Sequence, residues 1–78
     1  MTVSAYVLIQ TEVGKAATVA SAVAGIGGVT LAETVTGPYD AIVRVEGDTM
    51  DEIAKTVVSR VQMVDGITRT LTCEVVHL

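Results

Sequence analysis

Hydrophobic and polar residues follow two different periods along this chain. Four segments are rich in β-branched residues or alternate between apolar and polar positions, which predicts strands. These segments are Ser4–Thr11, Val29–Thr36, Ala41–Glu46 and Ile67–His77. Two other segments repeat apolar residues at spacings of three and four, which predicts one buried face of a helix. They are Lys15–Ala24 and the segment from Met50 to about Met63.

Local signals mark where these elements begin and end. Thr49 is a good helix N-cap, and Glu52 stands three residues later, as in a capping box. The first helix is expected to end at a group of glycines, Gly25, Gly27 and Gly28. A proline that fixes φ and an aspartate that bonds its own backbone predict a hairpin turn between the second and third strands. Its residues are Gly37, Pro38, Tyr39 and Asp40.

The order of the elements predicts an α+β fold of the ferredoxin-like βαββαβ type, with residues 1–78 forming one domain. Its four-stranded antiparallel sheet carries both helices on one face. Strict alternation along the strands then assigns the residues of the other face, which are Tyr6, Leu8, Ile42, Thr68, Thr70 and Thr72. Such a surface is too apolar for open water, so we expect the protein to dimerise through its sheets.

Composition strengthens the expectation of an oligomer. Half of the 78 residues are hydrophobic, and the mean hydropathy is +0.58. A domain this small needs a disulfide, a metal or a partner subunit to supplement its core. Cys73 has no second cysteine to pair with, and the sequence has no Cys/His cluster for a metal. We therefore expect no metal and no cofactor, and an oligomer instead.

The charge argues against nucleic acid as a direct partner. The net charge is −4 and the pI is about 4.6, whereas nucleic-acid-binding domains carry a basic stripe. The five basic residues are scattered along the sequence. No apolar run reaches the roughly 18 residues of a membrane span, and the N-terminus does not resemble a signal peptide. We expect a cytoplasmic protein that contacts neither DNA nor membrane.

Three short motifs, taken in order, resemble the C-terminal effector-binding domain of the Lrp/AsnC family of transcription regulators. The first is the glycine-rich helix end followed by valine at Gly28-Val29. The second is the turn Thr36–Asp40, which leads into the apolar strand Ala41–Val45. The third is the closing strand Gly66–Thr72. Each motif is weak alone, but their order and spacing cover essentially the whole chain.

The resemblance implies a ferredoxin-like domain that dimerises through its sheets and builds rings of four or five dimers, an octamer or a decamer. It also implies that free amino acids bind at contacts between dimers. This chain begins directly at the first strand of such a domain, so it resembles the stand-alone members that lack a helix-turn-helix. We expect an amino-acid-sensing domain in the regulation of amino acid metabolism that does not itself bind DNA. Full-length Lrp/AsnC regulators are a further candidate partner.

Two groups of residues are candidate ligand contacts. In the turn Gly37, Pro38, Tyr39 and Asp40, the carboxylate could accept hydrogen bonds from an ammonium group, and backbone amides could bind a carboxylate. The plainer interpretation is a turn whose aspartate bonds locally. The row Thr68, Thr70 and Thr72 could bond a small ligand through its hydroxyls. The alternative is three residues chosen for β-propensity.

The remaining polar residues suit structural roles better. Glu33 and Arg44, on neighbouring strands, could face an interface, but an exposed ion pair of little weight is the simpler interpretation. His77 is a lone histidine at the tail and fits a surface residue. Cys73 alternates with apolar residues, so we expect it to be buried.

Two other functions stay open from sequence. One is an enzyme of the dimeric α+β barrel type, which shares this topology and sheet pairing. Catalysis needs a proton-handling group in a cleft, and the chain has only Asp40, its glutamates and His77, with no Trp or Phe to line a cavity. We therefore expect no enzymatic activity. The other is a structural partner that mixes into rings with full-length regulators.

Overall fold

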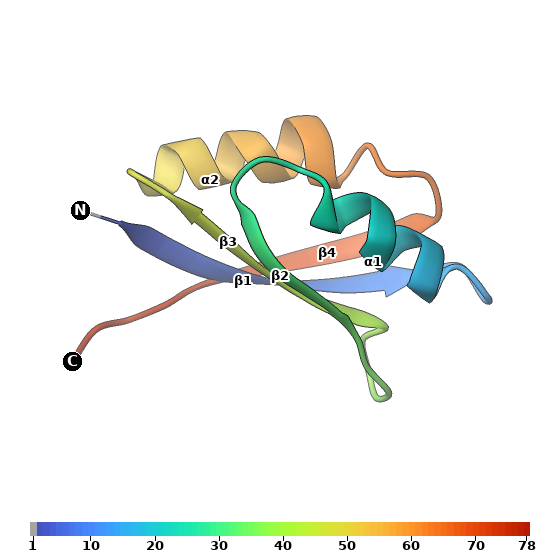
Figure 1. The fold of residues 1–78 in the computed structure, drawn as a ribbon. Helices are drawn as coiled ribbons and strands as arrows, with labels where there is room; N and C mark the ends of the chain where they lie inside the picture. Colours follow the sequence, from blue (N-terminus) through green and yellow to red (C-terminus); the bar gives the residue numbers. More distant parts are fainter. Residues whose placement is uncertain (1) are drawn as a thin grey trace.

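The computed structural model describes residues 2–78, and the strands among them form one antiparallel sheet with the order β2-β3-β1-β4. The elements in chain order are β1 (Val3–Thr11), α1 (Ala16–Ala24), β2 (Val29–Thr34), β3 (Ala41–Gly47), α2 (Met50–Thr56), the short π-helix η1 (Val57–Val61) and β4 (Ile67–Glu74). Both helices lie over the same side of the sheet (Figure 1). This arrangement confirms the predicted ferredoxin-like βαββαβ fold.

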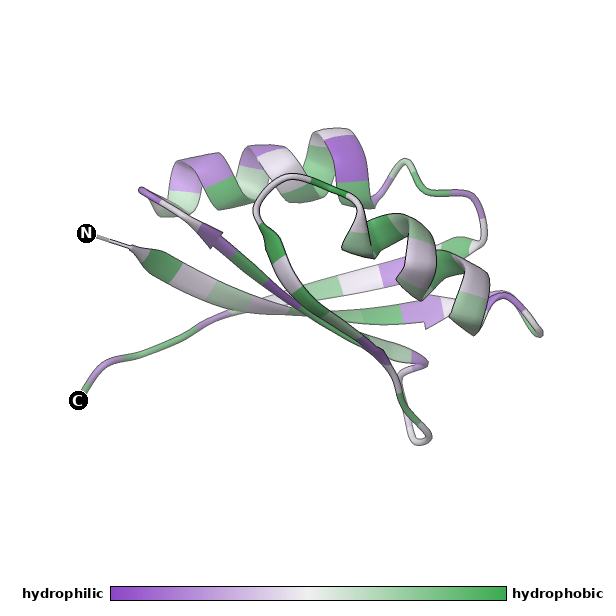
Figure 2. Ribbon diagram, viewed as in Figure 1, coloured by the Kyte–Doolittle hydropathy of each residue, from purple (hydrophilic) through white to green (hydrophobic). Residues whose placement is uncertain are grey.

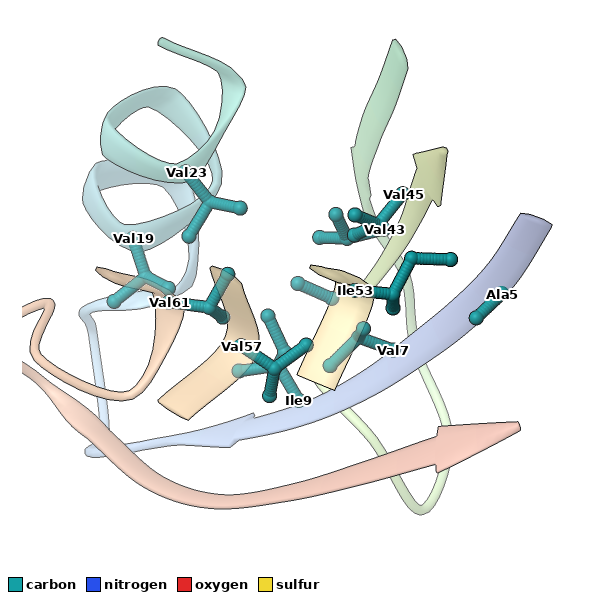
Figure 3. Close-up of a cluster of buried hydrophobic side chains, with 11 residues drawn as sticks. Ala5, Val7, Ile9, Val19, Val23, Val43, Val45, Ile53, Val57 and Val61 are labelled. Carbon is teal, nitrogen blue, oxygen red and sulfur yellow. The ribbon is translucent and has the colours of Figure 1, made fainter. Parts of the chain in front are cut away.

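The hydrophobic core fills the space between the sheet and the helices (Figure 3). Alternate residues of the two central strands point into it, and helix residues three or four positions apart meet them from above. Its most buried members are Ala5, Val7, Ile9, Val19, Val23, Ala41, Val43, Val45, Ile53 and Val61, each at most 1% exposed. Short, mostly β-branched side chains therefore make up this core.

The start of α2 follows the predicted cap. The backbone N–H of Glu52 donates to Thr49 Oγ1 at 3.2 Å, which satisfies one of the free donors at the helix start. The Glu52 carboxylate reaches back and accepts from the backbone N–H of Asp48 at 2.9 Å. An ideal capping box would close on Thr49 itself, so here the reciprocal bond lies one residue earlier.

The second helical segment is shorter and less regular than the pattern predicted. After Thr56 the backbone widens into η1, where the N–H of Gln62 donates to the carbonyl of Val57 at 2.8 Å. This keeps Val57 and Val61 buried, while Val58 is 62% exposed. The predicted apolar stripe therefore holds for Ile53, Val57 and Val61 but not for Ala54 and Val58, which are exposed.

Only one of the three glycines after α1 needs a left-handed backbone. Gly28 has a φ of +95°, and its carbonyl accepts from the N–H of Glu46 at 2.8 Å. A Cβ at this position would lie 3.2 Å from the Glu46 carbonyl oxygen. Gly25, which caps α1, has an ordinary φ of −83°. The turn from α1 into β2 therefore depends on Gly28.

A β-bulge in β4 decides which side chains of that strand face the helices. Ile67 lies opposite Thr11 and Arg69 lies opposite Gln10, so Thr68 is one extra residue on this strand. Side chains alternate regularly only after the bulge, which moves Arg69 to the side opposite Ile67. Ile67 packs against the core, whereas Arg69 is exposed.

The bulge makes one prediction from the sequence wrong. Thr70 and Thr72 lie opposite Ile9 and Val7, whose side chains are buried under the helices, so these threonines are on the helix side of the sheet. Thr68 is the extra residue of the bulge. The prediction assumed strict alternation from Ile67 and placed all three threonines on the face away from the helices. It did not account for the extra residue of the bulge.

The same error affected Cys73. It lies opposite Tyr6, on the side of the sheet away from the helices, and its thiol is exposed rather than buried.

No helix within residues 2–78 is both long enough and apolar enough to cross a membrane.

Candidate functional site

The sheet face away from the helices, called the open face below, carries two rows of side chains that run across the strands. Residues opposite each other on neighbouring antiparallel strands point to the same side, so the strand register defines these rows. The first row contains Leu31, Arg44, Tyr6 and Cys73. The second row contains Glu33, Ile42, Leu8 and Leu71. Arg69 extends the face at the β4 edge.

Apolar side chains dominate the open face. Tyr6 is 36% exposed, Leu31 41% and Leu71 42%, and Leu8 and Ile42 between them are partly buried. Figure 2 shows hydrophobic and polar residues interspersed along the strands, with both helices on one side of the sheet, so no helix covers the open face. Four neighbouring strands thus present large apolar groups to the outside, which is typical of an interaction surface.

A polar cluster occupies the end of this face near the start of β1. The guanidinium of Arg44 donates to Glu46 Oε2 at 3.2 Å, to the Tyr6 hydroxyl at 2.8 Å and to Ser4 Oγ at 3.0 Å. It also lies 5.3 Å from the centre of the Tyr6 ring, within the range of a cation–π interaction. Ser4 is only 6% exposed, so its hydrogen bond holds the guanidinium of Arg44 at the buried end of the cluster. These four residues are called the arginine cluster below.

The electrostatics of the cluster keep Arg44 charged and its charge balanced. The hydrogen bond to Glu46, and after it the one to Tyr6, raises the pKa of Arg44 above its ordinary value. Glu46 supplies the opposite charge from the same strand, because residues two apart on a strand point to the same side. The positive charge of Arg44 is therefore balanced within the protomer.

The hairpin turn between β2 and β3 forms a second candidate site, beside the C-terminal end of β1. The N–H of Asp40 donates to the carbonyl of Ile9 at 2.8 Å, and Asp40 Oδ2 accepts from the N–H of Thr11 at 2.8 Å. Gln10 Nε2 donates to the Pro38 carbonyl at 3.0 Å. The turn is thus anchored to the end of β1. The turn lies where it was predicted, but the Asp40 carboxylate bonds the backbone of Thr11 on β1 rather than the local backbone of its own turn, as had been expected.

An open hollow lies next to this turn. It is lined by Thr34, Val35 and Thr36, the residues that lead from β2 into Gly37. Gly37 itself has a φ of +144°, and a Cβ there would meet nothing within 4 Å. Two hydroxyl side chains and exposed turn backbone therefore border a space that a second molecule could enter.

The structure does not bring the two predicted ligand groups together within one protomer. The turn Gly37–Asp40 joins β2 to β3, whereas Thr68, Thr70 and Thr72 lie on β4, and β1 separates β3 from β4. Thr70 Oγ1 already accepts from Gln62 Nε2 at 2.8 Å on the helix side. The threonine row and the turn are thus two separate features of the protomer.

The arginine cluster is the main feature that the sequence analysis missed. The sequence suggests an ion pair of Arg44 with Glu33, but within residues 2–78 Arg44 forms its ion pair with Glu46. The signal was present, because Arg44 and Glu46 alternate with buried residues of the same strand. Ser4 and Tyr6 could be added only with the register of β1 against β3, which places them opposite Glu46 and Arg44.

Comparison with known proteins agrees with this geometry. Residues 4–77 match the model of the Lrp/AsnC ligand binding domain. Among solved structures, TTHA0845 from Thermus thermophilus is 26% identical, with a TM-score of 0.90 over 97% of this chain and 95% of that one. A search of curated proteins finds no match.

Two longer proteins share the fold at lower identity. AsnC from E. coli is 21% identical with a TM-score of 0.88, and the alignment covers 97% of this chain and 52% of AsnC. The transcriptional regulator NMB0573 from Neisseria meningitidis, solved as a complex with L-Met, is 16% identical with a TM-score of 0.83, over 96% of this chain and 50% of the regulator. This chain therefore spans about half the length of these two proteins.

Proposed function

Because the chain belongs to the family of Lrp/AsnC ligand-binding domains, we propose that it senses a small effector, a free amino acid, by forming a dimer that assembles into larger rings. The dimer pairs two sheets through their open faces. The effector binds where one dimer meets another. The protein regulates transcription through this assembly rather than through its own contact with DNA.

The observation that carries this proposal is the exposed apolar surface of the open face. Tyr6, Leu31 and Leu71 are each more than one-third exposed on a sheet whose other side is closed by helices. The protomer exposes 4844 Å², more than the roughly 4,500 Å² expected of a monomer of 8.1 kDa. Covering this face with a second copy removes apolar surface from water, which is the main favourable term in association.

The effector site is proposed at the hairpin turn. Asp40 supplies a carboxylate for an ammonium group, and the hollow at Thr34, Val35 and Thr36 supplies hydroxyls and space beside it. The complex of the Neisseria regulator with L-Met supports an amino acid as the ligand class. Thr68, Thr70 and Thr72 would contribute from a neighbouring subunit, because β1 separates them from the turn in one protomer.

The charge of the chain supports a division of labour with a DNA-binding partner. A net charge of −4 disfavours contact with phosphates, which requires clustered basic residues. The bound effector would act by linkage: a ligand that prefers one assembly state shifts the population toward that state by its differential affinity. Full-length relatives that join the same rings would convert this shift into a change in DNA binding.

Calorimetric titration of the purified protein with each common amino acid, paired with sedimentation velocity, tests the proposal. We expect one amino acid or a few related ones to bind and to change the distribution of oligomers. Asp40→Asn retains an oxygen for the Thr11 N–H but removes the charge, so it should weaken binding by about tenfold or more. Asp51→Asn, a matched change on α2, should leave binding unchanged.

Other results would redirect or overturn this account. If the protein forms rings but no amino acid binds, the sensing role fails and the role of a structural partner is left. Co-purification with a full-length regulator would then test that role. Equal affinity of Asp40→Asn and the unmodified protein would exclude the turn as the ammonium site.

A further inference from the structure

The arginine cluster has a role in the proposed dimer that goes beyond its effect on the protomer. We propose, on the premise that two open faces pair, that Arg44 with its own counter-ion Glu46 allows two copies of this face to meet and fixes how they align. The occupant of the open face is thus a second copy of this chain. The partner class follows from the charge of the cluster and from its position.

The position of the cluster places it inside any sheet-to-sheet contact. Arg44 and Glu46 lie on β3, and Ser4 and Tyr6 lie on β1, the two central strands of the sheet. The side chains of Arg44 and Glu46 are 30% and 36% exposed in the protomer, so each still has surface for a partner to cover. Pairing of two open faces would remove most of this remaining exposure to water.

The charge balance of the cluster explains why an identical face can be the partner. In a dimer with twofold symmetry the same surface is presented by both subunits, so two copies of Arg44 enter one interface. A buried charge without a partner is costly, and like charges repel. Here each Arg44 is already bonded to Glu46, Tyr6 and Ser4 of its own protomer. Because the cluster carries no net charge, it gives no particular attraction to an acidic or basic partner.

The arginine cluster is charged and the neighbouring second row is mainly apolar, and this difference in polarity fixes how the two sheets align. Ile42, Leu8 and Leu71 are the apolar part of that row, and hydrophobic attraction is non-directional, so these three side chains alone favour no single arrangement. A displaced partner would press leucine side chains onto the charged groups of the cluster and remove their remaining contact with water without replacement. The aligned arrangement places polar groups of the second copy against the cluster, which replaces the lost water and avoids this cost. The cluster therefore selects one pairing of the two sheets.

A set of variants measured by sedimentation equilibrium tests this proposal. Glu46→Gln leaves Arg44 without its counter-ion, and Arg44→Met leaves Glu46 without its own. Each single variant should raise the dimer Kd by about tenfold or more. The double variant Arg44→Met/Glu46→Gln removes both charges, so its Kd should return to within about threefold of the unmodified protein. Tyr6→Phe, which removes one acceptor of Arg44, should give a smaller increase in Kd.

Two controls make the set decisive. Glu12→Gln removes one negative charge from the loop after β1, away from the cluster, and should leave Kd unchanged. Circular dichroism of each variant shows whether the fold is retained, which we expect because the four side chains contribute little to the core between sheet and helices. Tyr6→Phe, the smallest change, keeps the test valid if a charge variant fails to fold.

The possible outcomes separate this inference from the function on which it rests. An unmodified protein that stays monomeric removes the dimer itself and the inference with it. An unmodified protein that dimerises, with Glu46→Gln within about twofold of its Kd, overturns the inference and leaves the dimer intact. The inference is also overturned if both single variants raise the dimer Kd and the double variant does not lower it again. The two residues would then act separately and not as a balanced pair.

Discussion

The two faces of the sheet use the same strands and differ in what completes them. On the helix side, Val7, Ile9 and Val43 are fully buried by α1, α2 and η1. On the open face, their neighbours Tyr6 and Leu71 keep more than one-third of their surface exposed. One face thus forms the core within the protomer, and the other is complete only in an assembly. Substitutions on the two faces should therefore affect different equilibria.

The largest effect should come from the core of the helix side. Ile9→Ala removes buried methyl groups from a fully enclosed position and leaves a cavity, which costs about 2–5 kcal/mol of unfolding free energy. Urea denaturation at a fixed protein concentration measures this loss. A change below about 1 kcal/mol would show that this face is not the closed core described above.

A charge on the open face should break the assembly while sparing the fold. Leu71→Asp places a carboxylate in the proposed interface, where burial without a partner weakens dimerisation by about 100-fold or more. Sedimentation velocity measures the assembly, and circular dichroism checks the fold. Val58→Asp is the matched control, because Val58 is also an exposed apolar residue but lies on η1, away from the sheet. Equal loss of the dimer in both variants would contradict the assignment of the interface to the open face.

The connection from α1 to the sheet offers a sharper test with two adjacent glycines. Gly28→Ala forces a residue with a Cβ to adopt a φ of +95° and brings that Cβ within 3.2 Å of the Glu46 carbonyl oxygen. The cost should be about 1–2 kcal/mol of unfolding free energy. Gly27→Ala meets nothing within 4 Å and should stay within about 0.5 kcal/mol. Thermal denaturation of the pair compares them, and similar melting temperatures would contradict the special role of Gly28.

The smallest expected effect concerns the helix that closes the core. Thr49→Ala removes the hydroxyl that accepts from the Glu52 N–H, at a cost of about 1 kcal/mol. Thr49→Ser retains that acceptor and should recover most of the loss. Urea denaturation of both variants measures the difference. If the alanine and serine variants are equally stable, the cap does not stabilise α2.

The fold could be predicted from the sequence because local periodicity carries the information. Each strand and helix was expected near its observed position, and the Thr49 cap and the turn at Gly37–Asp40 were identified from residue types alone. Boundaries were less accurate. The final strand ends at Glu74 rather than His77, and the second helix changes to a π-helix after Thr56.

The open face could be predicted only in part, because its composition depends on register. One extra residue at Thr68 reverses the alternation, so that Leu71 and Cys73, and not the threonines, complete this face. The arginine cluster joins residues 38 and 40 positions apart in sequence, Tyr6 with Arg44 and Ser4 with Arg44. Contacts across strands cannot be read from a local pattern. The polar part of the candidate interface therefore required the structure.

The accessibility of Cys73 tests the central claim most directly, because it is the only cysteine of the chain and it lies on the open face opposite Tyr6. Its rate of reaction with a thiol reagent can be measured over a dilution series, with the urea-unfolded chain as the reference. If a second copy covers this face, the thiol reacts much more slowly than the reference in concentrated protein, and the rate rises as dilution separates the subunits. A rate equal to that of the unfolded chain at every concentration would contradict the claim.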